Sequence, residues 1–176
     1  MTRPVTEFAI LRLRSPVSLA DPDLTAGLHR VSTQQSSWSG FPLHWFTYSK
    51  SENTFVCILS QWESVPAHQL SIDSPQNQAL LDLLLPKLDI FAFCHVDLRP
   101  LAPNSQLGTV FQAQHITWRE LDIDIPTHSP DEPKGDACGW AIDTPEPKFY
   151  VFRIANDAQI QSTHWTTMSR LTFGNP

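Results

Sequence analysis

Hydrophobic and polar positions follow two rhythms in the first hundred residues. Runs rich in β-branched and aromatic residues, which are typical of strands, lie at residues 5–13, 43–49, 54–62 and 90–98. Leu24, Leu28 and Val31 recur at helical spacing between the first two runs, and a leucine-rich segment from Pro75 precedes the fourth run. The pattern predicts the order β-α-β-β-α-β, with both helices on one face of a four-stranded sheet.

Capping residues mark the ends of the two predicted helices. Asp21 can cap the first helix, and Pro22 suits its first turn. Ser74 can cap the second helix, and Pro86 should kink it or end its regular part.

The segment 61–69, QWESVPAHQ, joins the third strand to the leucine-rich segment and has two interpretations. In the first, the strand ends at Trp62, and Glu63 and His68 lie on a surface helix. In the second, the segment covers a pocket, with His68 or a neighbouring residue pointing into it and Pro66 fixing the backbone.

The second half contains a weaker copy of this pattern. Three segments resemble strands of the first half and a fourth echoes the junction: residues 107–118, 138–144, 148–155 and 157–164. The proline-rich, acidic segment 119–136 predicts a long loop in place of a helix. We therefore expect an α+β fold in which a ferredoxin-like repeat over residues 1–100 and a degenerate second repeat over residues 101–176 pack as one domain.

Composition and charge exclude several classes of partner. The 176 residues carry 18 acidic and 12 basic side chains, for a net charge of −6, and Lys and Arg form no long run. A nucleic-acid groove or an anionic membrane surface would need the opposite balance. No apolar run approaches the ~18 residues of a membrane-spanning helix, and Arg12 and Arg14 interrupt the first apolar run. We expect a cytoplasmic protein that binds neither nucleic acid nor membrane.

Metal and nucleotide sites lack their usual sequence signatures. Cys57, Cys94 and Cys138 form no C-x-x-C pair, and the seven histidines show no metal-binding spacing. The chain has no G-x-G-x-x-G motif, no P-loop and no G-x-S-x-G motif. The sequence therefore predicts an activity without a metal or an organic cofactor.

A family resemblance rests on several of these segments together. They are VTEFAILRL, Gly40 followed by PLHWF, FVCILSQWESVPAH, the SP before the leucine-rich helix, and FCHVDL. In this order they resemble the dimeric α+β barrel superfamily, and above all fungal antibiotic-biosynthesis-monooxygenase-like proteins with two ferredoxin-like repeats per chain. The resemblance covers residues 5–98 well and residues 107–165 loosely.

The resemblance implies that two sheets close into a barrel, with pockets between each sheet and its own helices. The barrel could form within one chain, or two chains could pair as a homodimer. The superfamily includes cofactor-free monooxygenases, haem-degrading enzymes and polyketide cyclases, among which the fold alone does not choose. Asn77, Ser71 and Glu7 occupy the positions of the plant cyclases' His, Tyr and second His, so that acid–base set does not transfer. Asn77 also lies near the place of the haem-ligating His, which argues against haem.

Four polar residues are the candidates for catalysis. Glu7 interrupts an apolar strand, so it either lies at a solvated strand end or points into a polar cavity, where it could serve as a general base. Asn77, near the start of a helix, could donate hydrogen bonds to an enolate or carbonyl oxygen. His68 and His95 could act as acid–base groups, although either could instead be a surface or core histidine.

Residues on or beside the predicted strands could wall an apolar cavity for a polycyclic or unsaturated ligand, or could simply belong to the core. They are His44, Trp45, Phe55, Trp62, Trp140 and Phe149. Such a wall would act by holding a flexible substrate in one reactive conformation.

Three functions fit these features. The one we favour from the sequence is a cofactor-independent cyclase or isomerase acting on a reactive polyketide- or terpenoid-type intermediate of secondary metabolism. The second is a cofactor-free monooxygenase of a phenol or quinol. The third is a ligand-binding barrel without catalysis.

Overall fold

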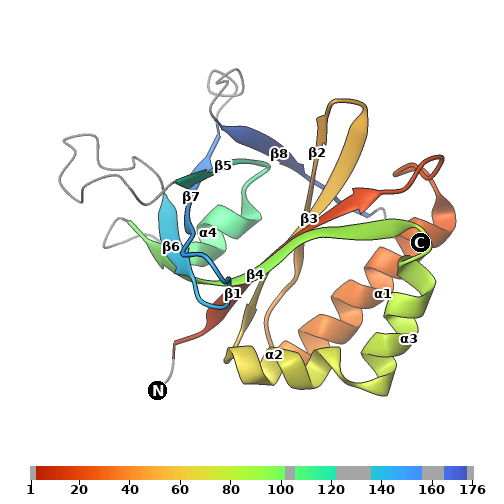
Figure 1. Cartoon of the computed structure of the whole chain (residues 1–176), viewed down its shortest axis with the longest axis horizontal. Coiled ribbons are helices and arrows are strands. Elements are labelled where there is room, and N and C mark those ends of the chain that lie inside the picture. The colour runs from red at the N-terminus through yellow and green to blue at the C-terminus, as the bar shows by residue number, and fades with distance from the viewer. Residues whose placement is uncertain (1–2, 102–105, 122–135, 156–164, 174–176) are drawn as a thin grey trace.

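The computed structural model describes residues 3–101, 106–121, 136–155 and 165–173 of the chain. Within these residues, eight antiparallel strands close into a barrel, and the fold is α+β (Figure 1). The strands are β1 (Val5–Leu13), β2 (His44–Lys50), β3 (Asn53–Trp62), β4 (Leu88–Pro100), β5 (His115–Leu121), β6 (Ala137–Ala141), β7 (Phe149–Ile154) and β8 (Thr166–Arg170). The helices are α1 (Pro22–Ser39), α2 (Val65–Ile72), α3 (Pro75–Leu84) and α4 (Leu107–Gln112).

The two halves of the barrel repeat one strand order. The first half runs β4-β1-β3-β2 and the second runs β8-β5-β7-β6, so each strand has a counterpart four places later in the chain. Antiparallel pairing of β2 with β8 and of β4 with β6 joins the halves. The barrel therefore closes within one chain.

The predicted caps lie at the ends of α1 and α3. The side chain of Asp21 accepts a hydrogen bond from the backbone N–H of Leu24, and that of Ser74 accepts one from Asn77. Gly40 ends α1 with φ 76°, a left-handed conformation that glycine adopts without strain. A third helix, α2, begins after Ser64 within the QWESVPAHQ junction.

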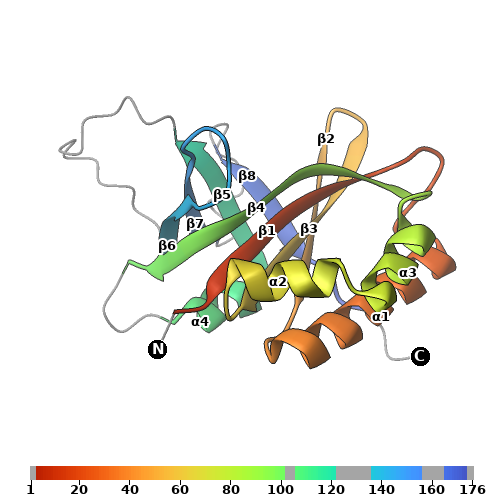
Figure 2. The same cartoon turned by 60° about the horizontal axis from the view of Figure 1, so that its bottom comes forward.

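Side chains of the first-half strands alternate between two separate cores. Phe8 and Ile10 of β1 point into the barrel, whereas Ala9 and Leu13 pack under the helices. Figure 2 shows α1, α2 and α3 together on the outer face of these strands, with α4 apart from them. Any cavity under the helices is thus walled by the odd-numbered residues of β1.

The second half departs from the predicted pattern at its start. Residues 107–112 form α4 instead of the first part of a strand, and the strand begins only at His115. The prediction was wrong because Leu107, Val110 and Phe111 also have helical spacing, and the helix buries Val110 and Phe111 in the barrel core. Most of the predicted loop over residues 119–136 and all of the segment 157–164 lie outside the described residues. None of the described helices is long and apolar enough to cross a membrane.

Candidate active site

A cavity of about 330 Å³ lies between the outer face of the first-half strands and helices α1, α2 and α3. Its floor comes from β1, β2, β3 and β4, and its roof comes from apolar side chains of the helices. Four polar side chains also line it: those of Glu7, Gln35, His68 and Asn77.

Glu7 holds a buried carboxylate at one end of this cavity. The residue is 4% exposed, and its Oε2 accepts hydrogen bonds from Gln35 Nε2 at 2.6 Å, Ser60 Oγ at 2.8 Å and Trp62 Nε1 at 3.0 Å. A buried carboxylate is costly unless such donors replace water. All three donors converge on one oxygen, and the described residues provide no donor to Oε1.

His68 lies beside this carboxylate. The residue is 5% exposed, its ring stacks on Trp62 with centroids 4.1 Å apart, and its Nε2 lies 3.8 Å from Glu7 Oε2. Burial lowers the pKa of His68 below its usual 6.5 and His95 acts in the same direction, while Glu7 and Asp143 oppose the shift. The imidazole is therefore neutral at pH 7.

His95 and Asp143 extend the contact into a chain of hydrogen bonds. His68 Nδ1 lies 2.8 Å from His95 Nε2, and His95 Nδ1 lies 2.5 Å from Asp143 Oδ2. The backbone N–H of His95 also donates to Asp143 Oδ1 at 2.9 Å. Burial acts to raise the pKa of Asp143, but the hydrogen bonds from His95 outweigh it and the net shift is downward.

The charge of Asp143 sets the tautomers along this chain. A carboxylate only accepts, so His95 donates from Nδ1 and accepts at Nε2. His68 must then donate from Nδ1, which leaves the lone pair on its Nε2. The chain therefore directs an unprotonated ring nitrogen of His68 toward Glu7 at the edge of an apolar cavity.

Sheet pairing explains why these groups meet. Glu7 pairs with Ser60 on β3 and with His95 on β4, so the three side chains are lateral neighbours on one face. The β1–β4 register shifts between Ile10 and Leu11, which leaves Phe91 as an extra residue in β4.

This bulge changes the alternation of β4. Ile90 before it and Phe93 and His95 after it lie on the helix side, although simple alternation would separate Ile90 from the other two. The ring of Phe93 packs against both imidazoles, at 5.7 Å from His68 and 5.3 Å from His95. The bulge thus lets β4 contribute both an aliphatic wall and a polar group.

Asp143 reaches the site from the second half of the chain. Strand β6 pairs with β4 as far as Ala141, and Ile142 then donates its backbone N–H to the carbonyl of His95 at 2.8 Å. At Gly139, a Cβ would collide with the backbone of Asp97, so only glycine permits this close approach. The second half therefore completes a chain whose other members belong to the first.

The structure brings together most of the predicted catalytic residues. Glu7, His68 and His95 form one connected group, and the pocket interpretation of the QWESVPAHQ junction holds because His68 is buried. Asn77 lines the same cavity, but its Nδ2 donates to the carbonyl of Ile72 at 3.3 Å. Asn77 is thus available at the cavity and has no contact with the histidines.

Two of the predicted wall residues lie at the site. Trp45 lines the cavity, with its Nε1 donating to Ser32 Oγ at 2.6 Å. Trp62 supports the site from behind, because it stacks on His68 and donates to Glu7.

The other four predicted wall residues lie elsewhere. His44 and Phe55 face the barrel interior, since neighbours along a strand point to opposite faces and Trp45 takes the helix side. Trp140 is 45% exposed on β6 and packs against Phe149 on β7, in the second half. Their assignment to the cavity wall was wrong because aromatic content alone does not tell which face of a strand a residue occupies.

Three further members of the site were not predicted from the sequence. Ser60 shares a strand face with Trp62, and Gln35 follows Val31 by one helical turn, so periodicity carried a signal for both. Asp143 lies in a turn 48 residues from His95, and no local pattern connects the two.

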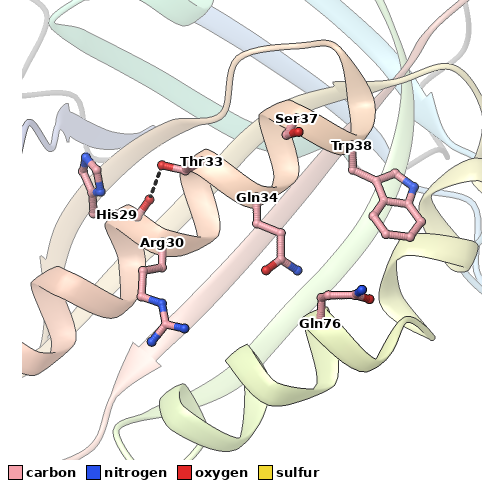
Figure 3. A pocket seen from close by; sticks show the side chains of 7 residues that line it. All are labelled: His29, Arg30, Thr33, Gln34, Ser37, Trp38 and Gln76. Atoms are coloured by element: carbon pink, nitrogen blue, oxygen red, sulfur yellow. Dashed lines mark hydrogen bonds between the residues drawn. The ribbon is translucent and has the colours of Figure 1, made fainter.

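A larger and more open groove lies on the surface between α1 and α3 (Figure 3). It measures about 770 Å³ and is lined by His29, Arg30, Thr33, Gln34, Ser37, Trp38 and Gln76. Six of these residues are exposed, and the hydrogen bond drawn there, from Thr33 Oγ1 to the carbonyl of His29, belongs to α1 itself. Because it buries no ionisable group, we place the candidate active site in the smaller cavity.

Comparisons with known proteins identify the fold. No family model matches the chain, and no curated protein matches its sequence. A solved structure from Fusobacterium nucleatum subsp. nucleatum, which bears the provisional name monooxygenase, superposes with a TM-score of 0.54. The match covers 94% of this chain and 91% of that one at 6% identity. The chain has the α+β barrel fold of that protein.

A second solved structure, from Lactobacillus acidophilus NCFM and also provisionally named a monooxygenase, gives a TM-score of 0.48. It is 12% identical, over 95% of this chain and 93% of that one. At 6% identity, the first likeness describes the shared fold and leaves the activity to be argued from the site.

Proposed function

We propose that the protein is a cofactor-independent enzyme that moves a proton on a small apolar substrate and thereby cyclises or isomerises it. The observation that carries the proposal is the hydrogen-bonded chain from Asp143 through His95 to His68, which ends beside Glu7 at an apolar cavity. Buried ionisable groups with specific charge partners cluster at functional sites, which makes this chain a candidate for proton transfer.

His68 is the proton acceptor in this proposal. Nε2 of His68 carries a free lone pair, and the chain through His95 to Asp143 stabilises the protonated ring. Glu7 Oε2, in contrast, already accepts three hydrogen bonds, and only its Oε1 lacks a donor among the described residues. A carbon-bound proton next to a substrate carbonyl passes to Nε2, and its bonding electrons become an enolate. The imidazolium so formed lies between the Glu7 carboxylate and His95, whose own partner is the Asp143 carboxylate.

The second half of the reaction returns the proton. Delivery from His68 to a different carbon of the enolate gives an isomer. Attack of the enolate carbon on an electrophilic carbon of the same substrate closes a ring, and the new oxyanion takes the proton. The amide of Asn77, at the start of α3, has a second N–H with which it can stabilise the enolate oxygen.

A monooxygenase would begin with the same step. The provisional name of the F. nucleatum protein motivates this second candidate, although that likeness concerns the fold. A carbanion formed at His68 could react with dioxygen, so that a CH2 group becomes a carbonyl, the second oxygen leaves as water, and the substrate supplies the electrons.

Deuterium exchange tests the shared step without knowledge of the natural substrate. A methyl n-alkyl ketone incubated with the protein in D2O should gain deuterium at its α-carbons faster than in buffer, as followed by mass spectrometry. Uptake of dissolved oxygen, with a product heavier by one oxygen atom less two hydrogens, would favour the monooxygenase. Exchange no faster than in buffer would contradict both enzymatic functions and favour a binding protein.

A further inference from the structure

The candidate cavity is a slot whose length follows β1. Glu7, Ala9 and Leu11 line it in succession, and these four residue steps span roughly 13 Å. Helix α3 runs above the same path from Asn77 to Leu84, about 10 Å. The slot is therefore elongated, with Glu7 and Asn77 at one end and Leu11 and Leu84 at the other.

Polarity changes along this slot. The polar side chains of Glu7, Gln35 and His68 are grouped at the first end, because Gln35 donates to Glu7 and His68 Nε2 lies 3.8 Å from the same carboxylate oxygen. Beyond them the wall is mainly aliphatic, with leucines and isoleucines from α3 and β4: Leu80, Leu81, Leu84, Leu85, Leu88 and Ile90. Aromatic rings come only from Trp45 and Phe93 among the described lining residues. This wall fits an aliphatic chain better than the flat polycyclic ligand expected from the sequence.

The charged residues that line the slot restrict which polar group the ligand can carry. Among the described residues that line the slot there is no Lys or Arg, and Glu7 is the one acidic residue. Arg12 and Arg14, which flank the far end in the sequence, both pair with Asp89. A carboxylate or phosphate would therefore be buried beside Glu7 without a counter-ion, at a high free-energy cost.

The two ends also differ in exposure. Glu7 and His68 are 4% and 5% exposed, whereas Leu85 and Ile90 are 38% and 56% exposed. Glu7 and His68 are thus closed off from solvent although Phe93 beside them is 41% exposed, and the aliphatic end reaches solvent at Leu85 and Ile90.

From these observations we infer that the substrate is a neutral molecule with a carbonyl head and an aliphatic tail, bound with the head against Glu7 and His68 and the tail toward Leu85 and Ile90. The inference rests on the proposed proton transfer for the position of the carbonyl. The tail is recognised by burial alone, so chain length should determine affinity.

Calorimetric titration with three homologous series tests this assignment. Methyl n-alkyl ketones, with alkyl groups from propyl to nonyl, should bind about fourfold more tightly for each added methylene until the slot is full. Fatty carboxylates of equal length should bind at least tenfold more weakly than the ketones. Tighter binding of carboxylates or of n-alkylammonium ions, or affinities independent of chain length, would overturn the inference.

A pair of leucines on α3 provides the matched control. Leu81 lines the slot, whereas Leu83 is 50% exposed and is not among its lining residues. Leu81→Ala should weaken binding of the nonyl ketone about fivefold to tenfold and leave the propyl ketone unchanged, because only the long tail reaches it. Leu83→Ala should change neither, and equal losses in both variants would contradict the assignment.

The binding experiment and the exchange experiment test different claims, so either can fail without the other. A normal chain-length series without α-carbon exchange would keep the ligand class and reject the proposed catalysis. Exchange without any chain-length dependence would keep the catalysis and reject the aliphatic slot.

Discussion

At the scale of single residues, Glu7 and His68 differ in how many donors surround them. Three donors satisfy one oxygen of Glu7, whereas Nε2 of His68 has none from the described residues. The sequence suggested Glu7 as the base, but the geometry favours His68 as the base and Glu7 as the charge that stabilises its protonated form.

Replacement of Glu7 tests that electrostatic role. Glu7→Gln keeps the shape of the side chain and removes the charge beside His68, so the rate of ketone α-carbon exchange should fall by about 10²-fold. Glu63→Gln is the control, because Glu63 is exposed and close in the chain to the same junction. Full exchange activity in Glu7→Gln would mean that the pocket acts by shape alone.

The pH dependence follows from the lowered pKa of His68. Only the neutral imidazole accepts a proton, so activity should be maximal above pH 6.5 and should decline only at lower pH, as His68 becomes protonated. A pH–rate profile of α-carbon exchange measures this. A decline that already begins above pH 6.5 would show that a different group, or a His68 with a raised pKa, controls the reaction.

Asp143 is a positioning residue that acts on His68 through His95. Asp143→Asn removes the charge that fixes the His95 tautomer, so the exchange rate should fall about 10-fold or more. Because Asp143 raises the pKa of His68, its loss should also move the acidic decline to lower pH. Asp97→Asn, on a half-buried residue of β4 paired with Arg3 and Arg99, is the control. A lower rate with an unmoved pH profile would indicate a purely structural role.

At the scale of elements, α2 presents His68 to the site. The hydroxyl of Ser64 caps this helix by accepting from the backbone N–H of Ala67 at 3.2 Å, and His68 follows one turn later. The stacking of His68 on Trp62 then joins the helix to the end of β3.

Loss of the cap should therefore affect both stability and activity. Ser64→Ala should lower the free energy of unfolding by about 1 kcal/mol and reduce α-carbon exchange, since His68 loses its fixed position. Ser64→Asp retains a capping oxygen and should restore both. Chemical denaturation and the exchange assay measure the two effects, and a Ser64→Ala variant with normal activity would show that stacking on Trp62 is sufficient.

Elements with local signals were predictable from the sequence, and those shaped by distant contacts were not. Asp21 and Ser74 marked the starts of α1 and α3, because capping depends on residues within one turn. The bulge at Phe91 depends on packing between segments far apart in the chain, which periodicity does not encode. At the start of the second half the spacing fitted a helix as well as a strand, and packing in the barrel core decided between the two.

The same limit applied to the site. Glu7 and His95 were recognisable as polar residues within apolar strands, and His68 as a polar residue just after one. Their partnership with Asp143 depends on how β6 follows β4, which is decided by closure of the barrel.

At the scale of the whole molecule, closure of the barrel within one chain fixes two seams, the strand pairs β4–β6 and β2–β8 that join the halves. The β4–β6 seam places Asp143 at the site of the first half. The other seam, between β2 and β8, carries His44, whose Nδ1 lies 3.0 Å from Arg170 Nη2.

The stability that the β2–β8 seam contributes should decrease at acidic pH. Burial, with a further effect of Arg170, lowers the pKa of His44 from 6.5 to about 4. The unfolded chain thus binds this proton more readily, so the stability due to neutral His44 is complete above pH 6.5 and is lost as the pH falls toward 4. His44→Gln keeps an acceptor for Arg170 and should flatten this decline, by at most about 3 kcal/mol in the free energy of unfolding. Parallel curves for both proteins in denaturant titrations would exclude His44 as the cause.

The central claim is that Nε2 of His68 takes a proton from a substrate bound in the slot. His68→Asn tests it most directly, because an asparagine can keep an N–H for His95 while it removes Nε2. The measurement is the rate of deuterium incorporation into a saturating long-chain methyl ketone at pH 7.5, with ketone affinity determined in parallel. Our account predicts that exchange falls by at least about 10²-fold while the affinity changes little. Exchange at the wild-type rate in a variant that still binds the ketone would contradict it.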